Sequence, residues 1–137
     1  MTDLPQRDPG KSPAEDMMSA SAGEAQELPG TVRAALANAM VGMKKKYYGK
    51  GPTAARAWVL DDYVFVALEG GLTANEETLL ADGKEDVVRG YRLSFQETMT
   101  GPITAAVAEI VGRPVLTYHS QIVFHPVRTF EIFVLGP

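Results

Sequence analysis

Basic and aromatic side chains gather between Lys44 and Gly51, where the sequence reads Lys-Lys-Lys-Tyr-Tyr-Gly-Lys-Gly. Cations beside glycines, whose backbone a ligand can approach closely, are residue types that suit anion binding. The segment is not a Walker phosphate loop, because it lacks the full glycine spacing and the closing Lys-Ser/Thr pair. Two interpretations remain: a solvated helix end whose cations complement the helix dipole, or a site for an anionic partner such as a phosphate, a lipid headgroup or an acidic protein.

Arg56 is the second charged residue that could do chemistry. A two-residue turn at Asp61-Asp62 predicts a hairpin in which Arg56 shares one face with Trp58, Tyr63 and Phe65. An unpaired guanidinium is costly to bury. Arg56 must therefore reach solvent, stack on an aromatic ring or pair with a carboxylate.

Arg92 and Gln96 lie one helical turn apart and could bring polar groups to the same site. If they converge with Arg56, the three form a pocket that can hold a carboxylate or another oxyanion by charge-assisted hydrogen bonds. The structural alternative is an internal ion pair between Arg56 and Glu76 or Glu97. With the cations beside the two glycine breaks added, the candidate ligand-binding residues are Arg56, Arg92, Gln96, Lys50 and Arg113.

Catalytic and metal-binding patterns are missing from the sequence. The two histidines, His119 and His125, have no companion at metal-ligand spacing, and no nucleophile-elbow motif surrounds Ser120. We therefore expect no metal site, no cofactor and no enzymatic activity.

Composition indicates one soluble domain with an acidic tail. The chain has 137 residues, no cysteine and a net charge of −4, all of which falls in residues 1–30. Residues 1–29 are rich in Pro, Ser, Ala, Gly and Glu, so we expect a disordered tail there and a single domain over 30–137. The neutral domain does not indicate nucleic acid as a partner. Without a secretory signal or a run of about 18 apolar residues, we expect a cytoplasmic protein with no membrane span.

The elements that must position these residues occur in two similar series of helix, Gly/Pro break, strand, turn and strand. The first helix is expected from Thr31 to the break at Gly49, and a capping box at Thr73 opens a short helix. The apolar stripe of the next helix meets Thr100-Gly101-Pro102, which indicates either a kink or a new helix. With strands near 115–121 and 129–135, we expect an α+β fold: two α-β-β halves forming a four-stranded, mainly antiparallel sheet with helices on one face.

Both faces of the first predicted hairpin are apolar. A sheet with one face in water should alternate apolar and polar residues, and this one does not. Three or four helices can hardly cover both faces within one chain. We therefore expect a homodimer or higher oligomer, with Trp58, Tyr63 and Phe65 as the candidate interface.

Several short motifs resemble one small bacterial family. They are Gly51-Pro52-Thr53 with Arg56-Ala57, Asp61-Asp62, Leu72-Thr73 with Glu76, Arg92 with Phe95-Gln96 and Met99, Gly112-Arg113 with Val115, and the final run from Glu131 to Leu135. This pattern is similar to the MpsC-like family, named for component C of a proposed Na+-translocating membrane-potential-generating system. The family usually has a further basic residue after Gly-Pro-Thr, where this chain has Ala54, and that departure weakens an anion-binding role for the turn.

The resemblance implies an accessory protein rather than a transporter, since a chain without a spanning element cannot translocate an ion alone. The expected function is a non-enzymatic cytoplasmic accessory or regulatory protein of a membrane ion or bicarbonate transport system, peripheral to the membrane. Its expected partners are a second copy and a membrane transport component. The alternative is a small-ligand or anion-binding sensor domain that uses Arg56, Arg92 and the 44–50 segment.

Overall fold

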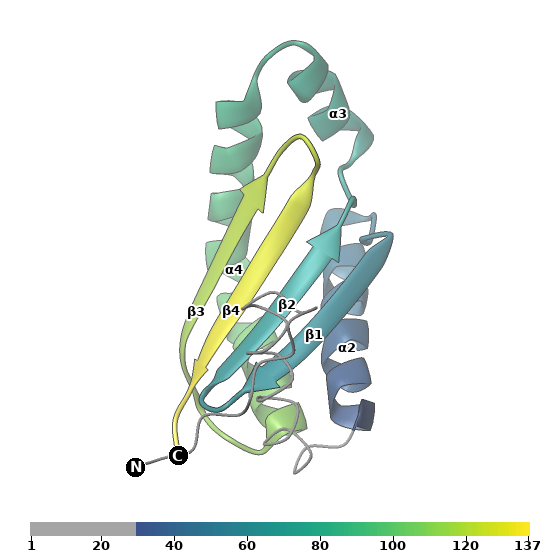
Figure 1. Ribbon diagram of the computed structural model, residues 1–137. Helices are drawn as coiled ribbons and strands as arrows, with labels where there is room; N and C mark the ends of the chain where they lie inside the picture. Colours follow the sequence, from purple (N-terminus) through teal and green to yellow (C-terminus); the bar gives the residue numbers. More distant parts are fainter. Residues whose placement is uncertain (1–29) are drawn as a thin grey trace, which may run out of the picture.

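The computed structural model of the protein describes residues 30–137, and the predicted tail over 1–29 lies outside the described residues. Within this range the two predicted α-β-β series are present, with one short helix between them (Figure 1). The elements in chain order are α2 (Gly30–Tyr48), β1 (Ala54–Leu60), β2 (Tyr63–Glu69), α3 (Ala74–Ala81), α4 (Glu85–Val111), β3 (Val115–Val123) and β4 (Arg128–Leu135). The fold is α+β, as predicted.

The four strands form one antiparallel sheet in the order β1-β2-β4-β3. Each half of the chain thus contributes one hairpin, and the second strands of the two hairpins pair in the middle. The predicted register of the first hairpin is confirmed, with Leu60 opposite Tyr63, Trp58 opposite Phe65, and Arg56 opposite Ala67. Asp61 makes the tight turn possible with a left-handed φ of 52°, a conformation that Asp tolerates better than most residues.

The two long helices cover the same face of the sheet, which is the arrangement expected from the sequence. Figure 1 shows α2 and α4 behind the strands, while α3 lies beyond one end of the sheet. Strand residues that point toward the helices alternate with residues that point away, so the covered face supplies one side of the core. The buried core consists of Val59, Val64, Val66, Leu68, Phe133 and Leu135 from the strands, and Leu36, Met40, Met99, Ile103 and Val107 from the helices.

Helix α4 runs without a break through Pro102. The sequence left open whether a new helix begins at this proline, and the structure answers with one helix of 27 residues. It ends at Gly112, whose φ of 71° lies in the left-handed region that closes helices. Arg92 and Gln96 lie in the first half of this helix, toward the end of the sheet where α3 begins.

The short helix α3 opens with the predicted capping box. The Thr73 hydroxyl accepts a hydrogen bond from the Glu76 amide at 3.2 Å, and the Glu76 carboxylate accepts one from the Thr73 amide at 2.9 Å. A second, smaller core of Leu72, Val88 and Ile122 attaches this end of the molecule to α4 and β3. The cap therefore fixes the Glu76 side chain at a defined position next to α4.

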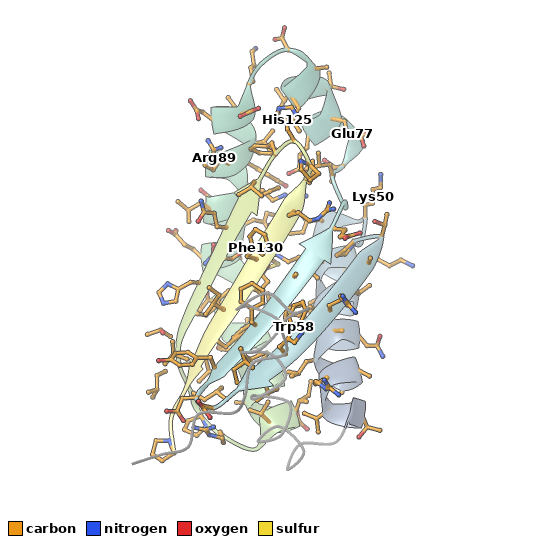
Figure 2. The ribbon with its side chains drawn as sticks, in the orientation of Figure 1. Lys50, Trp58, Glu77, Arg89, His125 and Phe130 are labelled. Carbon is orange, nitrogen blue, oxygen red and sulfur yellow. The ribbon has the colours of Figure 1, made fainter. Side chains whose placement is uncertain are left out.

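The other sheet face, which we call the open face, carries a row of aromatic side chains. The rings of Trp58 and Phe65 lie 5.7 Å apart between centroids, and those of Phe65 and Phe130 lie 5.9 Å apart. Trp58 and Phe130 extend over the strands on the side away from α2 and α4 (Figure 2). Tyr63 on the same face keeps 51% of its surface exposed. The open face thus combines the three predicted interface residues with one aromatic residue of β4, Phe130.

Candidate functional site

A buried ion pair lies between the sheet and helix α2. Glu131 occupies a helix-facing position of β4 and is fully buried at 0% exposure, and Lys44 of α2 is 4% exposed. The Lys44 Nζ lies 2.7 Å from Glu131 Oε1, although the angle between the groups falls short of a good hydrogen bond. The Tyr118 hydroxyl donates to the other carboxylate oxygen. Burial first, and then the nearby Glu131 carboxylate, raise the pKa of Tyr118, so the phenol keeps its proton.

A second buried ion pair connects α3 with α4. Arg92 donates from Nε and Nη2 to the two carboxylate oxygens of Glu76 at 2.5 and 2.6 Å, and Nη2 also donates to the Gly71 carbonyl at 3.1 Å. Burial alone would raise the pKa of Glu76, but the hydrogen bonds from Arg92 and Thr73 outweigh burial and hold that pKa below its usual range. Burial opposes the charge of Arg92 as well, and the bonds to Glu76 outweigh it and raise the pKa of Arg92.

Tyr48 stands between the two ion pairs. Its ring centroid lies 4.0 Å from Arg92 Cζ and 5.5 Å from Lys44 Nζ, distances at which cations attract an aromatic face. Its aromatic neighbours are Phe95 and Tyr91, at 4.5 and 6.4 Å between ring centroids. The Tyr48 hydroxyl is buried and has no hydrogen-bond partner among the described residues. Burial raises the pKa of Tyr48 to about 12, so this hydroxyl is a donor at neutral pH.

A cavity of about 220 Å³ opens beside these groups, between α2, α4 and the two strands of the second hairpin. Its charged lining residues are Lys44, Arg89 and Arg92, and the carboxylates of Glu76 and Glu131 are not part of the lining. Polar lining comes mainly from Tyr48, Gln96, Ser120 and Thr129. This cavity, with the two ion pairs behind it, is the candidate functional site.

Gln96 joins the helix wall of the cavity to its strand wall. With its amide turned to satisfy both partners, Gln96 donates to the Ser120 carbonyl at 3.2 Å and accepts from the Ser120 amide at 3.3 Å. Two of the five predicted ligand-binding residues, Arg92 and Gln96, therefore line one cavity, as their spacing of one helical turn suggested.

Arg56 does not reach this cavity. It is exposed on β1, where its Cζ lies 6.0 Å from the Trp58 ring centroid, and it shares the open face rather than the face covered by the helices. The condition for the predicted pocket of Arg56, Arg92 and Gln96 is thus not met, because the sheet separates the first residue from the other two. Of the two carboxylates proposed as alternative partners, Glu76 pairs with Arg92 and Glu97 is exposed on α4.

The two remaining candidates are not part of this cavity's lining, although Lys50 shares a separate, much smaller pocket with Lys44 and Arg92. Lys50 is exposed, and its Nζ lies 4.0 Å from Glu77 Oε1 in a solvent-screened pair. Arg113 donates to the Asp61 carbonyl at 2.9 Å, to Asp62 Oδ1 at 2.6 Å and to the Gly136 carbonyl at 2.8 Å. Those contacts connect the first hairpin turn to the end of β4, so they give Arg113 a structural role.

Sequence reasoning named the segment that holds Lys44 and Tyr48 but missed their burial, and it missed Tyr118 and Glu131 as site residues, although a signal was present. Lys44 follows Leu36 and Met40 at intervals of four on the buried stripe of α2. Glu131 alternates with apolar residues on the helix-facing side of β4. A charge at an apolar position of two adjacent elements indicates an internal pair, because a lone buried charge is strongly disfavoured.

Within residues 30–137, no three His, Cys, Asp or Glu side chains are grouped closely enough to hold a metal ion. In the same range, none of the helices has a stretch long and apolar enough to span a membrane.

Comparison with known proteins assigns the chain to a family. Residues 29–136 match the family described as the Na+-translocating membrane potential-generating system (MpsC). Neither the curated proteins nor the solved structures contain a match. The match extends from the start of α2 to the end of β4 and includes both walls of the cavity and the open face. The chain therefore belongs to the MpsC family.

Proposed function

We propose that this protein is a non-catalytic accessory component of a Na+-translocating membrane-potential-generating system, and that it works as a homodimer joined through the open face. Family membership supports the link to the membrane system. The observation that carries the mode of action is the apolar, aromatic open face, for which the described part of the chain supplies no covering helix.

The chemistry of the open face favours another protein surface as its partner. Three strands place Leu60, Trp58, Phe65, Ala67, Phe130, Ile132 and Val134 on this side, as their pairing registers require. Among the described residues, the Asp, Glu, Lys and Arg side chains on the same strand face are confined to one end, where Arg128 Nη2 lies 3.5 Å from Glu69 Oε1 and Arg56 follows on the edge strand. The other edge strand, β3, adds the polar residues Thr117, His119 and Gln121 to this face. A large apolar patch with a charged rim is the usual composition of a protein interface.

A second copy is the occupant that fits this patch best. A two-fold dimer brings the same patch of each copy together, so each aromatic row would meet another aromatic row. Because the centre of the patch carries no charge, the contact would bury no unpaired cation or carboxylate. Two sheets that face one another in this way pack about 10 Å apart, as in a sandwich.

Light scattering on the full chain at micromolar concentration tests the dimer. We expect about twice the 14.8 kDa mass of the chain. Phe65→Lys places a charge in the middle of the patch and should yield the monomer. Val87→Lys is the matched control, because Val87 is 52% exposed on α4 and outside the open face, and this variant should stay dimeric. A monomeric wild type contradicts the proposal.

Isolation of the tagged protein from native membranes tests the accessory role. We expect an integral membrane ion-transport protein, identified by mass spectrometry, to be retained at a constant ratio to the tagged chain. Its absence, under conditions that keep the membrane system active, contradicts the accessory role even if the dimer is real. Light scattering therefore tests the dimer, and isolation from membranes independently tests the association with a transport protein.

A further inference from the structure

The cavity between α4 and the second hairpin has a lining chemistry that the proposed accessory role does not use. Its three charged lining residues are all cations, Lys44, Arg89 and Arg92. The carboxylates that pair with two of them stand outside the lining, so the cavity walls present N–H donors. Among residues 30–137, the third cation, Arg89, forms an ion pair only with Asp86, which is 98% exposed, and such a pair is screened by water.

Further donors of the cavity are unused by the protein itself. The buried hydroxyl of Tyr48 makes no well-aligned hydrogen bond to a described residue, although the Arg92 guanidinium lies close to it. Arg92 donates hydrogen bonds from Nε and Nη2 to Glu76 and Gly71, and no hydrogen bond to a described residue comes from its Nη1. A buried polar group without a partner normally costs stability. The Tyr48 side chain belongs to the lining of a cavity whose charged lining residues are all positive.

The size of the cavity limits the ligand. Its volume of about 220 Å³ lies below the ~300–1,000 Å³ of pockets that hold drug-sized molecules. A nucleotide or a peptide is therefore too large to be enclosed, while an anion of a few heavy atoms fits. Bidentate donors such as guanidinium groups match the paired oxygens of carboxylates and phosphates.

We propose that this cavity is a binding site for a small oxyanion of the carboxylate or phosphate class. Arg92 and Arg89 supply charge-assisted hydrogen bonds, and the Tyr48 hydroxyl donates a further one. Lys44 contributes positive charge from the floor of the cavity while it holds Glu131. The ion pair of Arg92 with Glu76 positions the guanidinium, so the site is formed before the ligand arrives.

Titration calorimetry on the full chain tests the site with two separate probes, inorganic phosphate and malonate, at constant ionic strength set with sodium chloride. Saturable binding of at least one probe is expected, and the stronger probe identifies the class of anion. Tyr48→Phe and Arg89→Gln should each weaken binding about tenfold, as expected for the loss of one hydrogen bond to a charged group.

The variants are chosen so that loss of folding cannot mimic loss of the site. Tyr48→Phe keeps the ring beside Arg92 and removes a hydroxyl that makes no well-aligned hydrogen bond within the described part of the chain, so its thermal stability should match the wild type. Arg56→Gln is the matched control, since Arg56 is an exposed cation on the open face, and its affinity should be unchanged. Absence of saturable binding by both probes overturns the proposal. So does an equal loss of affinity in Arg56→Gln, which indicates general charge attraction.

Discussion

At the scale of single residues, the unusual feature of the protein is charge placed inside the helix-covered side of the sheet. Glu131 and Lys44 are almost fully buried, as are Glu76 and Arg92. Each pair is neutral, and additional hydrogen bonds come from Tyr118 to Glu131 Oε2 and from Thr73 to Glu76. Such pairs contribute little net stability, but the removal of one partner leaves a buried charge that is very costly.

This asymmetry predicts the outcome of a double-mutant cycle on the first pair. Lys44→Met should lower the free energy of unfolding by about 3–5 kcal/mol, because Glu131 would remain buried without its cation. The double variant Lys44→Met/Glu131→Gln should recover a large part of that loss, since the glutamine can still accept the Tyr118 hydrogen bond. Urea denaturation measures both values. Equal destabilisation of the single and double variants would contradict a charge-based coupling.

The second pair predicts a pH dependence whose direction follows from Glu76. Its folded pKa is lowered, so its stabilising effect is complete above the unfolded pKa of about 4.3 and is lost as pH falls through the folded pKa. The free energy of unfolding should therefore decline below roughly pH 4.3, and Glu76→Gln should flatten that decline. Glu77→Gln, at an exposed neighbouring carboxylate, is the control that should keep the wild-type slope. An unchanged slope in Glu76→Gln would rule out this origin.

At the scale of elements, helix α4 shows how tertiary context overrides a local break signal. Pro102 lacks the N–H of a helix interior, and Gly101 precedes it. The helix nevertheless continues, because Met99 before the break and Ile103 and Val107 after it are all buried in the core. The packing of these three residues outweighs the free-energy cost of a proline inside the helix.

Two glycines, one inside α4 and one directly after it, should respond in opposite ways to substitution by alanine. Gly101 is helical and exposed, and a Cβ built there meets no atom within 4 Å. Gly101→Ala should therefore stabilise the protein by roughly 0.5–1 kcal/mol. Gly112→Ala should destabilise it, because φ is 71° at this helix end. Thermal denaturation gives both signs, and a stabilising Gly112→Ala would contradict the assigned cap geometry.

The sequence predicts the hairpin and capping box well because their signals are local. The Asp61-Asp62 turn fixes the register of the first hairpin, and the spacing of Thr73 and Glu76 fixes the cap. Strand order could not be derived, since pairing of β2 with β4 depends on contacts far apart in the chain. The site was only half predicted for the same reason. Arg92 and Gln96 share one helix, whereas Arg56 was placed on the correct face but could not be located relative to that helix.

At the scale of the whole molecule, the two α-β-β halves meet at β2 and β4, and stability is distributed unevenly around that junction. These two strands pair on both sides and carry the buried residues Val64, Val66 and Phe133. Helix α3 instead rests on the smaller core and on the ion pair of Arg92 with Glu76. Regions with few buried apolar contacts open locally at lower free energy than the central strands.

Native-state hydrogen exchange should reveal this hierarchy. Amides of β2 and β4 should exchange only through global unfolding, because breaking either strand separates the two halves of the core. Amides of α3 should exchange faster through local opening. Glu76→Gln should accelerate their exchange further. In the same variant, the amides of the central strands should lose protection only in proportion to the loss of global stability. Exchange of α3 as slow as that of β4 would mean that both cores open together. In that case the Arg92–Glu76 pair would belong to the global folding unit rather than to a separately opening end of the molecule.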